Sequence, residues 1–250
     1  MTDVQISIRN KTYPNALQPT IKDFQLSLNS NEFVCLVGSS GCGKTTLLNC
    51  LSGLDNHYDG DIDLGGFKNL RGLNADASPK IGYIFQNPRL LPWRTVRENI
   101  ELVLPPQQSP DVVDGLLDFM QLTKSQHEYP ERLSVGMNRR VAIIRAFAVN
   151  PDLLLMDEPF VSLDPPTARD VRSLLLQLWQ QRPHTVLFVT HDLREAIALA
   201  DRLIFLASAP MRVLSDIVVP IPRIQRHDEA AIENFRQQLI NDYPAIKQLL

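Results

Sequence analysis

Long apolar runs are missing from this 250-residue chain. None approaches the roughly 20 residues that a membrane-spanning helix requires. Residues 1–9 alternate polar and apolar side chains and lack the apolar segment of a signal peptide. Cysteine is also scarce: the three cysteines lie within residues 35–50, and an odd number of thiols cannot all pair with one another. These absences predict a cytosolic protein in a reducing compartment.

A strong charge of one sign is missing as well. The formal net charge is −3, with 25 Lys and Arg against 28 Asp and Glu. Because a dedicated nucleic-acid-binding protein usually carries a basic domain or stripe, we expect no nucleic-acid partner. Hydrophobic residues make up 44% of the chain, close to the average of soluble domains. This length and composition allow one large α/β domain, or two small ones, with a sizeable core.

The hydrophobic pattern predicts an α/β fold. Alternating apolar residues at 4–8 and 24–28 indicate an antiparallel hairpin, whereas the continuous apolar run 33–37 is typical of a buried parallel strand, followed by a helix at 44–54. Between 87 and 150, prolines interrupt helical patterns, which indicates a mostly helical insertion. Strands alternating with helices imply a parallel sheet with helices on both faces. Further strands are expected near 62, 81–85, 153–156, 185–189, 203–206 and 213–219, and further helices at 112–121, 138–149, 167–181, 193–200 and 229–240.

A complete phosphate-binding loop follows the first buried strand. The pattern G-x-x-x-x-G-K-[ST] is matched without exception, with an apolar strand before it and a helical pattern after it. Its glycines let backbone N–H groups curl around phosphate oxygens at a helix N-terminus. We expect Lys44 to reach the β- and γ-phosphates of ATP, Thr45 to coordinate Mg²⁺, and Cys42 to be reactive toward maleimides. The alternative is a glycine-rich turn that binds nothing. The loop consists of Gly38, Ser39, Ser40, Gly41, Cys42, Gly43, Lys44 and Thr45.

Two acids end a second apolar strand. Residues 153–156 are Leu-Leu-Leu-Met, and Asp157 and Glu158 follow directly. This order places both carboxylates at the carboxyl edge of the sheet, where α/β proteins bind ligands. Asp157 is expected to hold Mg²⁺ through water, and Glu158 to orient or deprotonate an attacking water. A pair of solvated acids at a strand end is the alternative.

Four further segments occur in a particular order: Gln86, the run Leu133-Ser134-Val135-Gly136-Met137, the run 162–164, and His191. Together with the phosphate-binding loop and the two acids, they resemble the nucleotide-binding subunits of ABC transporters over nearly the whole chain. The resemblance is specific, because few nucleotide hydrolases carry all six elements in this order.

The resemblance implies a single ABC ATPase domain, 1–250, with two lobes. The catalytic core comprises 1–87 and 151–250 and includes an antiparallel side sheet, and the helical lobe, 88–150, carries the signature segment 133–137. Two such subunits sandwich two ATP molecules, so Ser134 and Gly136 of one chain would face the γ-phosphate held by the other. A helix N-terminus aimed at phosphate stabilises its charge only in the closed dimer.

The resemblance also implies individual roles. Tyr13 would stack on adenine, although a surface turn tyrosine is the alternative. His191 would contact the γ-phosphate and help to fix the attacking water, and Thr46 would join the phosphate contacts. Asp164 would cross the dimer interface. Gln86 would bind Mg²⁺ and link its occupancy to movement of the helical lobe.

The stretch 86–96 is similar to that of importers of nitrate, taurine and alkanesulfonates, where this surface receives a cytoplasmic helix of the membrane subunit. Trp93 is therefore the expected contact with transmembrane permease subunits; packing inside the helical lobe is the alternative. A homodimer on the cytoplasmic side of the inner membrane, served indirectly by a solute-binding protein, is implied. Val135 departs from the usual glycine, and its β-branched side chain is expected to restrict the backbone and hinder dimer closure.

The sequence therefore predicts an ATP-hydrolysing subunit that energises uptake of a small solute. One rival is a non-transport ABC ATPase that acts on nucleic acid or ribosomes, but the coiled coils, tandem nucleotide domains or basic extensions of such proteins are not visible here. A second rival is a regulatory module without turnover, against which Glu158 argues. The transported solute is not encoded in these motifs, because its selection belongs to the membrane and solute-binding partners.

Overall fold

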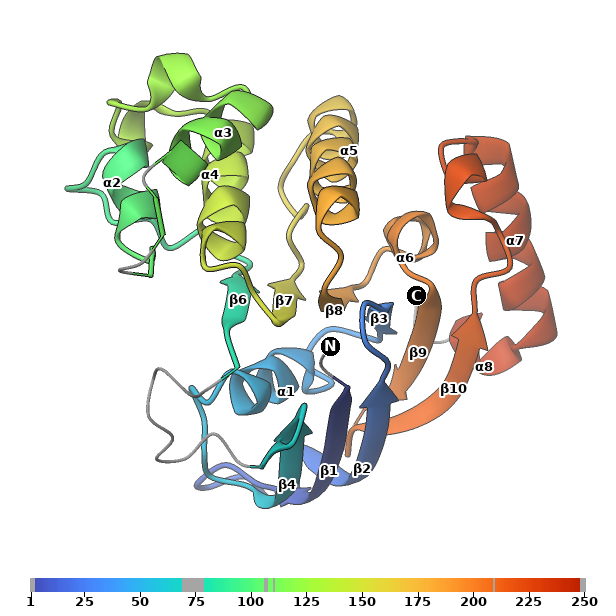
Figure 1. Ribbon diagram of the computed structural model, residues 1–250. Coiled ribbons are helices and arrows are strands. Elements are labelled where there is room, and N and C mark those ends of the chain that lie inside the picture. The colour runs from blue at the N-terminus through green and yellow to red at the C-terminus, as the bar shows by residue number, and fades with distance from the viewer. Residues whose placement is uncertain (1–2, 69–78, 106–107, 110, 209, 248–250) are drawn as a thin grey trace. The chain divides into compact units, whose positions relative to one another are not determined.

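The computed structural model describes residues 3–68, 79–105, 108–109, 111–208 and 210–247. The chain forms two compact units, which Figure 1 shows as ribbons. Unit 1 comprises Met1–Pro79 and Thr185–Leu250, and unit 2 comprises Lys80–His184. Among the described residues, no helix has the length and apolar character needed to cross a membrane.

Unit 1 contains an antiparallel sheet in the order β2-β1-β4-β5. Residue Val4 of β1 pairs with Leu28 of β2 on one side and with Leu64 of β4 on the other. Alternate side chains of β1 and β2 are buried, because successive residues of a strand point to opposite faces. The hairpin predicted from this alternation is confirmed. The strands are β1 (Val4–Lys11), β2 (Ile21–Leu28), β4 (Asp59–Leu64) and β5 (Phe67–Lys68).

The second sheet of unit 1 is mixed. Its central strand β3 is completely buried and pairs in parallel with β8 and β9, as the continuous apolar run predicts. The last strand, β10, is antiparallel to β9, whereas the sequence pattern predicts a parallel sheet. Only residues 208–211 connect these two strands, too few for the crossover that a parallel pair requires. The strands are β3 (Phe33–Val37), β8 (Thr185–Thr190), β9 (Arg202–Ala207) and β10 (Arg212–Val218).

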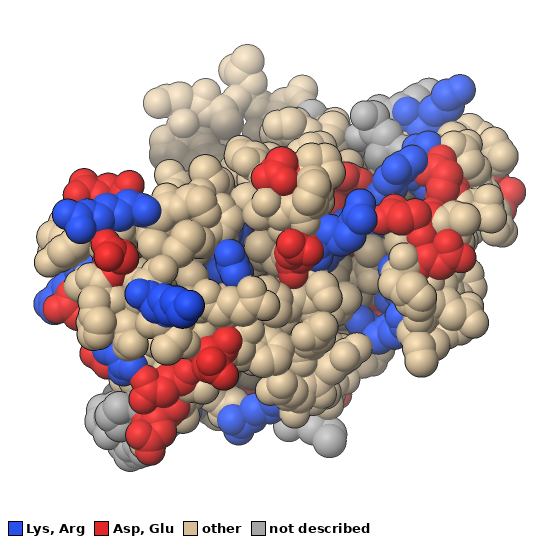
Figure 2. All heavy atoms as spheres, turned by 90° about the horizontal axis from the view of Figure 1, so that it is seen from above, with Lys and Arg blue, Asp and Glu red and all other residues tan. Residues whose placement is uncertain are grey.

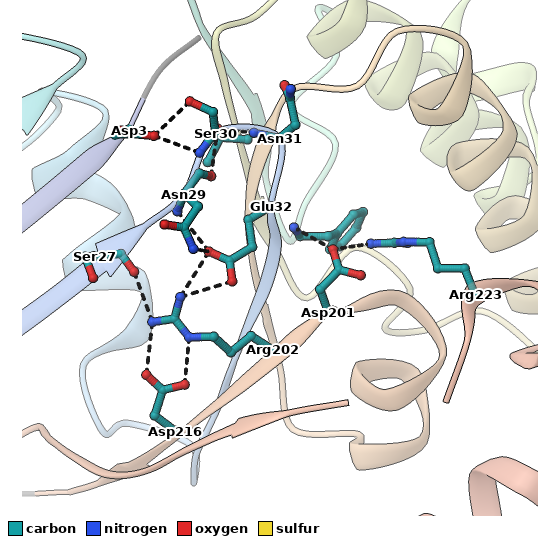
Figure 3. A network of polar contacts seen from close by, with 12 residues as sticks. Asp3, Ser27, Asn29, Ser30, Asn31, Glu32, Asp201, Arg202, Asp216 and Arg223 are labelled. Atoms are coloured by element: carbon teal, nitrogen blue, oxygen red, sulfur yellow. Dashed lines mark hydrogen bonds and ion pairs between the residues drawn. The ribbon is translucent and has the colours of Figure 1, made fainter. Parts of the chain in front are cut away.

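A polar network fixes β3 within unit 1 (Figure 3). Arg202 at the start of β9 donates to both carboxylate oxygens of Glu32, at 3.0 and 3.1 Å, and to both of Asp216, at 2.6 and 3.0 Å. The neighbouring Asp201 accepts hydrogen bonds from the Phe33 amide, at 3.1 Å, and from Arg223, at 2.6 Å. Because these groups come from the start of β3, from the neighbouring β9 and β10, and from the C-terminal segment, they hold the strand that carries the phosphate-binding loop. The helices of unit 1 are α1 (Lys44–Leu51), α6 (Leu193–Leu199), η3 (Arg223–Gln225), α7 (Glu229–Asp242) and α8 (Pro244–Lys247).

Unit 2 is mostly helical around a parallel strand pair, β6 (Ile81–Ile84) and β7 (Leu153–Asp157). Helix α2 was not predicted as a separate element, although Thr95 and Glu98 form a capping box at its start. Helix α4 begins at 135 rather than at 138, because the Ser134 side chain accepts a hydrogen bond from the Met137 amide and caps it. The helices are α2 (Val96–Glu101), α3 (Asp111–Phe119), η1 (Thr123–Ser125), η2 (Pro130–Arg132), α4 (Val135–Ala148) and α5 (Pro165–Gln181).

Acidic and basic side chains are interspersed on the surface drawn in Figure 2. Among the described residues, ion pairs such as Arg194 with Glu233, at 2.6 Å, and Arg97 with Glu101, at 3.1 Å, join the two signs of charge. The view shows no continuous basic stripe across the described residues of that face, in line with the near-neutral composition.

Candidate functional site

The phosphate-binding loop joins β3 to α1 in unit 1, and its glycines are required by geometry. Gly41 and Gly43 have φ angles of 77° and 110°, in the region that side chains rarely adopt. A Cβ at Gly43 would also lie 3.0 Å from Cγ2 of Thr20, and one at Gly38 would lie 3.2 Å from the carbonyl oxygen of Leu206. The loop thus keeps its curled backbone only with glycine at these positions.

Lys44 is the fixed cation of this loop. Its side chain is 6% exposed, and Nζ donates to the carbonyl oxygens of Gly38, at 2.7 Å, and Ser39, at 2.9 Å. Thr45 and Ser40 are exposed at the same turn. Backbone N–H groups, an ammonium group and a hydroxyl at one helix N-terminus are the donors that a polyphosphate needs, so the residues present fit a nucleotide.

The side chain of Cys42, within the phosphate-binding loop, is buried. Its side chain is 2% exposed, and its Sγ is 3.9 Å from Nζ of Lys44. A reagent must reach a thiol before it can react. Burial of this thiol therefore argues against the ready maleimide modification that the sequence led us to expect. The predicted helix N-terminus beside Cys42 is present, but the sequence motif does not determine whether the Cys42 side chain is buried or exposed.

Tyr13 is tied to helix α1, which follows the loop. Its hydroxyl lies 3.2 Å from Oγ1 of Thr46, so the structure brings together two predicted nucleotide-binding residues that are distant in sequence. Nζ of Lys11 lies 4.4 Å from the centre of the Tyr13 ring and pairs with Asp55 at 2.6 Å. Sequence analysis missed Lys11 and Asp55, because a lysine that ends an amphipathic strand gives no signal of burial.

His191 is exposed in the turn between β8 and α6 of unit 1. Its neighbours fix that turn. Oγ1 of Thr190 accepts from the Asp192 amide and donates to Glu195, both at 3.0 Å. The Asp192 carboxylate caps α6 by accepting from the amides of Arg194 and Glu195. The position of the imidazole is therefore set by a strand end and a capped helix.

The two predicted acids lie at the end of β7 in unit 2. Asp157 is 5% exposed, whereas Glu158 is half-buried. Glu158 has a φ of 44° and Ser162 a φ of 67°, so two residues without glycine's freedom adopt left-handed backbone within one loop. Such strain persists only where the surrounding structure fixes it, and it clusters at functional sites. This observation supports Glu158 as more than a solvated acid.

The signature segment starts helix α4 in unit 2. Gly136 is buried, and a Cβ there would lie 2.6 Å from Cγ2 of Thr167 in α5. The Thr167 amide in turn donates to the Asp164 carboxylate at 3.1 Å. Val135 is 57% exposed and is not among the described residues with positive φ. Val135 therefore uses ordinary helical backbone, which suits valine as well as glycine, and the expected hindrance of dimer closure by its side chain stays a prediction.

Residues 85–95, here called the 85–95 loop, connect β6 to α2 and carry Gln86 and Trp93. Both side chains are exposed, Trp93 by 69%, which argues against packing of this tryptophan inside the unit. Asn99, 0% exposed, holds the turn beneath it. Its Oδ1 accepts from the Leu91 amide at 2.7 Å, and its Nδ2 lies 3.1, 3.0 and 2.9 Å from the carbonyl oxygens of Leu91, Arg94 and Thr95.

The predicted site residues thus fall into two sets, one in each unit. Unit 1 carries Tyr13, the phosphate-binding loop, Thr46 and His191, and unit 2 carries Gln86, Ser134, Gly136, Asp157, Glu158 and Asp164. Across the described ranges, no group of three His, Cys, Asp or Glu side chains forms a metal centre by itself. The predicted Mg²⁺ ligands are the hydroxyl of Thr45, the amide oxygen of Gln86 and the carboxylate of Asp157. All three are oxygen ligands, which this ion prefers.

A glycine-rich loop between a buried parallel strand and a helix, with acids at the end of another such strand, defines a P-loop nucleoside triphosphatase. Residues 21–161 match the ABC transporter family, and the chain belongs to it. Among solved structures, a dimeric ATP-binding cassette in a post-hydrolysis state bound to ADP and Pi has a TM-score of 0.74 and 28% sequence identity. That match covers 89% of this chain and 100% of that one.

Several related proteins are importer subunits. A nitrate import ATP-binding protein of Synechococcus elongatus is 38% identical over 236 residues, which are 90% of this chain and 84% of that protein. An aliphatic sulfonates import ATP-binding protein of Bacillus subtilis is 34% identical over 250 residues, 98% and 96% of the two chains. A taurine import ATP-binding protein of Escherichia coli is 40% identical over 211 residues, 82% and 81% of the two chains.

The chain is therefore the ATP-binding and ATP-hydrolysing subunit of an ABC-type importer, as the sequence motifs predict. Importer subunits of this kind work with membrane permeases, and the cassette fold forms dimers. The rival function on nucleic acid or ribosomes is not favoured by these relatives.

Proposed function

We propose that this ATPase energises uptake of a small solute with an oxyanionic group, such as nitrate, a sulfonate or taurine. The observation that carries the proposal is the set of related proteins, whose named solutes all contain a compact oxygen-rich group. Solute selection itself belongs to the permease and the solute-binding protein. This chain supplies the work of transport by hydrolysing ATP.

Residues of both units take part in ATP binding and hydrolysis. Lys44 and the backbone amides of residues 38–45 bind the β- and γ-phosphates, with Thr46 beside them, and Tyr13 stacks on adenine. Glu158 accepts the proton of the attacking water, and His191 contacts the γ-phosphate and orients that water. Thr45, Gln86 and Asp157 would hold Mg²⁺, which would supply positive charge that neutralises phosphate oxygens.

A head-to-tail homodimer completes each site. Ser134 and Gly136 at the N-terminus of α4 face the γ-phosphate bound by the second copy, and Asp164 lies at the interface between copies. The start of α4 supports this role, because Ser134 and Val135 are exposed there and the first N–H groups of a helix have no partner within the helix. The boundaries of the catalytic core, 1–87 and 151–250, and of the helical signature lobe, 88–150, belong to the same proposal.

Trp93 is the proposed anchor for a permease subunit on the cytoplasmic side of the membrane. An exposed tryptophan on a turn fixed by Asn99 is a preorganised contact, and such aromatic anchors dominate binding energies. The subunit is then peripheral to the membrane and meets the solute-binding protein only through the permease.

Two measurements test the function. Purified protein should release phosphate from ATP in the presence of Mg²⁺ and not in excess EDTA. Reconstituted in vesicles with its permease and solute-binding protein, it should drive ATP-dependent uptake of nitrate, taurine or an alkanesulfonate. ATP hydrolysis without uptake of any of these solutes would refute the solute class, and loss of uptake in Trp93→Ala with retained basal hydrolysis would support the anchor.

A further inference from the structure

Helix α4 and the 85–95 loop are joined by arginines. Nη1 and Nη2 of Arg139, on α4, donate to the consecutive carbonyl oxygens of Phe85 and Gln86, both at 2.9 Å. Farther along the helix, Arg145 donates to the carbonyl oxygens of Pro88, at 2.7 Å, and Arg89, at 2.9 Å. Helix α4 therefore donates hydrogen bonds to four carbonyl oxygens within five residues of the loop that carries Gln86.

The environment of Arg139 is unusual for a cationic side chain. Its side chain is 2% exposed, its three hydrogen bonds all go to backbone carbonyls, and burial lowers its pKa. Among the described residues, its Nε has no hydrogen-bond partner. A buried guanidinium is unfavourable unless its geometry is well satisfied, and a planar fork on two adjacent carbonyls is highly directional. An apolar residue at this position could bond neither carbonyl, and a lysine would lack the planar, rigid pair of donors that meets both.

A third contact extends the link. Nη2 of Arg139 lies 3.4 Å from the carbonyl oxygen of Val161, in the loop that runs from the strained Glu158 toward Asp164. Arg139 is also the fifth residue after Ser134, on the same helix. One buried side chain thus contacts the Gln86 backbone and the loop after Glu158, from a helix whose start is the signature segment.

We infer that Arg139 is a positioning residue that makes the Gln86 loop and the signature end of α4 move as one body, so that nucleotide occupancy sensed at Gln86 is transmitted to Ser134. The inference rests on the proposed function. A helix is stiff over one to two turns, so a displacement of the Phe85 and Gln86 carbonyls must either break both bonds or shift the whole start of α4. Truncating the fork leaves ATP binding intact and uncouples the two segments.

Arg140 provides a matched control. It is the next residue of the same helix, its Nε likewise has no hydrogen-bond partner among the described residues, and its Nη1 donates to the Met120 carbonyl at 3.1 Å. That carbonyl lies after α3, away from the 85–95 loop. Arg140→Gln therefore removes a similar side chain from the same helix without touching Gln86.

The experiment compares wild type, Arg139→Gln, Arg139→Lys and Arg140→Gln by steady-state ATP hydrolysis and by hydrogen exchange with and without a non-hydrolysable Mg²⁺–ATP analogue. For Arg139→Gln we expect kcat to fall about tenfold with KM for ATP changed less than about twofold, the pattern of a lost transition-state contribution. The analogue should slow exchange at 85–91 and at 134–138 in wild type, but only at 85–91 in Arg139→Gln. Arg139→Lys keeps the charge and one bond, and should recover part of kcat.

The outcomes separate the two claims. If wild type neither binds nor hydrolyses ATP, the proposed function fails and this inference with it. If wild type is active but Arg139→Gln keeps wild-type kcat and protection at 134–138, the positioning role alone is wrong. Equal losses in Arg139→Gln and Arg140→Gln would show a general packing effect and would also overturn it. Should Arg139→Gln not fold, wild-type kcat and exchange in Arg139→Lys would decide against the inference.

Discussion

The phosphate-binding loop of unit 1 and the 85–95 loop of unit 2 are held in opposite ways. The first is shaped by its own residues: Gly41 and Gly43 supply the left-handed backbone, and Lys44 folds onto carbonyls five and six residues before it. The second is held from outside by side chains of two helices, Asn99 of α2 and Arg139 and Arg145 of α4.

This difference separates the loop that binds phosphates from the loop that transmits a signal to another part of the unit. A loop fixed by its own backbone keeps its geometry whatever its neighbours do, which suits the binding of phosphates. A loop fixed by side chains of another element is displaced whenever that element is displaced, which suits the transfer of a signal. Substitutions in the first region should change ATP binding or turnover, and those in the second should change stability or coupling while ATP binding persists.

The largest effect is expected from Glu158→Gln. The amide keeps the shape of the side chain but cannot accept a proton, so kcat should fall by about 10²–10⁴-fold while ATP still binds. Phosphate release and equilibrium binding measure the two parts, and Glu131→Gln, an exposed glutamate of the same unit, is the control. Turnover near wild type would assign the base to another residue.

Lys44→Ala should weaken ATP binding by about 10²-fold, since it removes a charge-assisted contact with two phosphates worth about 3 kcal/mol. Calorimetric titration with ATP checks this, with the exposed Lys22→Ala as the comparison. Thermal stability should change little, because the Gly38 and Ser39 carbonyls become available to water. Wild-type affinity in Lys44→Ala would contradict the placement of the nucleotide at this loop.

Asn99→Ala tests the other region. It removes the side-chain partner of the Leu91 amide and of the Arg94 carbonyl, whereas the Leu91 and Thr95 carbonyls keep backbone donors, so unfolding should become easier by about 2–3 kcal/mol. Thermal denaturation should show a midpoint lower by roughly 5–10 °C, whereas the exposed Asn87→Ala should not. ATP affinity should stay at the wild-type value. A loss of affinity as large as that in Lys44→Ala would break the distinction between the two loops.

The smallest effect is expected from Val135→Gly. Because Val135 occupies ordinary helical backbone, only its exposed side chain can hinder the approach of a second copy. We expect basal ATP turnover to rise about two- to threefold at high subunit concentration, and helix α4 to lose up to about 1 kcal/mol of stability. Turnover measured against concentration tests this, with Val112→Gly in the first turn of α3 as the matched change. An unchanged or lower curve would mean that the valine does not limit closure.

Sequence reasoning reached the phosphate-binding loop, both acids and most strands, because each is encoded by contiguous residues. Glycine spacing fixes the loop, and a run of buried aliphatic residues fixes β3, β7 and β8. It missed α2, although the capping box of Thr95 and Glu98 was visible as T-x-x-E. The predicted start of α4 is three residues too late, because Ser134 was assigned to the signature segment and not recognised as the N-cap of the helix.

By itself, the sequence determined which backbone turns are possible and which chemical groups stand beside them, since glycine freedom, strand periodicity and helix caps act over a few residues. Only the tertiary structure decided that Cys42 is buried and that Arg139 donates hydrogen bonds to the backbone carbonyls of Phe85 and Gln86. Arg139 and Gln86 are 53 residues apart. Such a contact depends on how a helix docks against a loop far away in the chain, and no local pattern of polar and apolar residues encodes that.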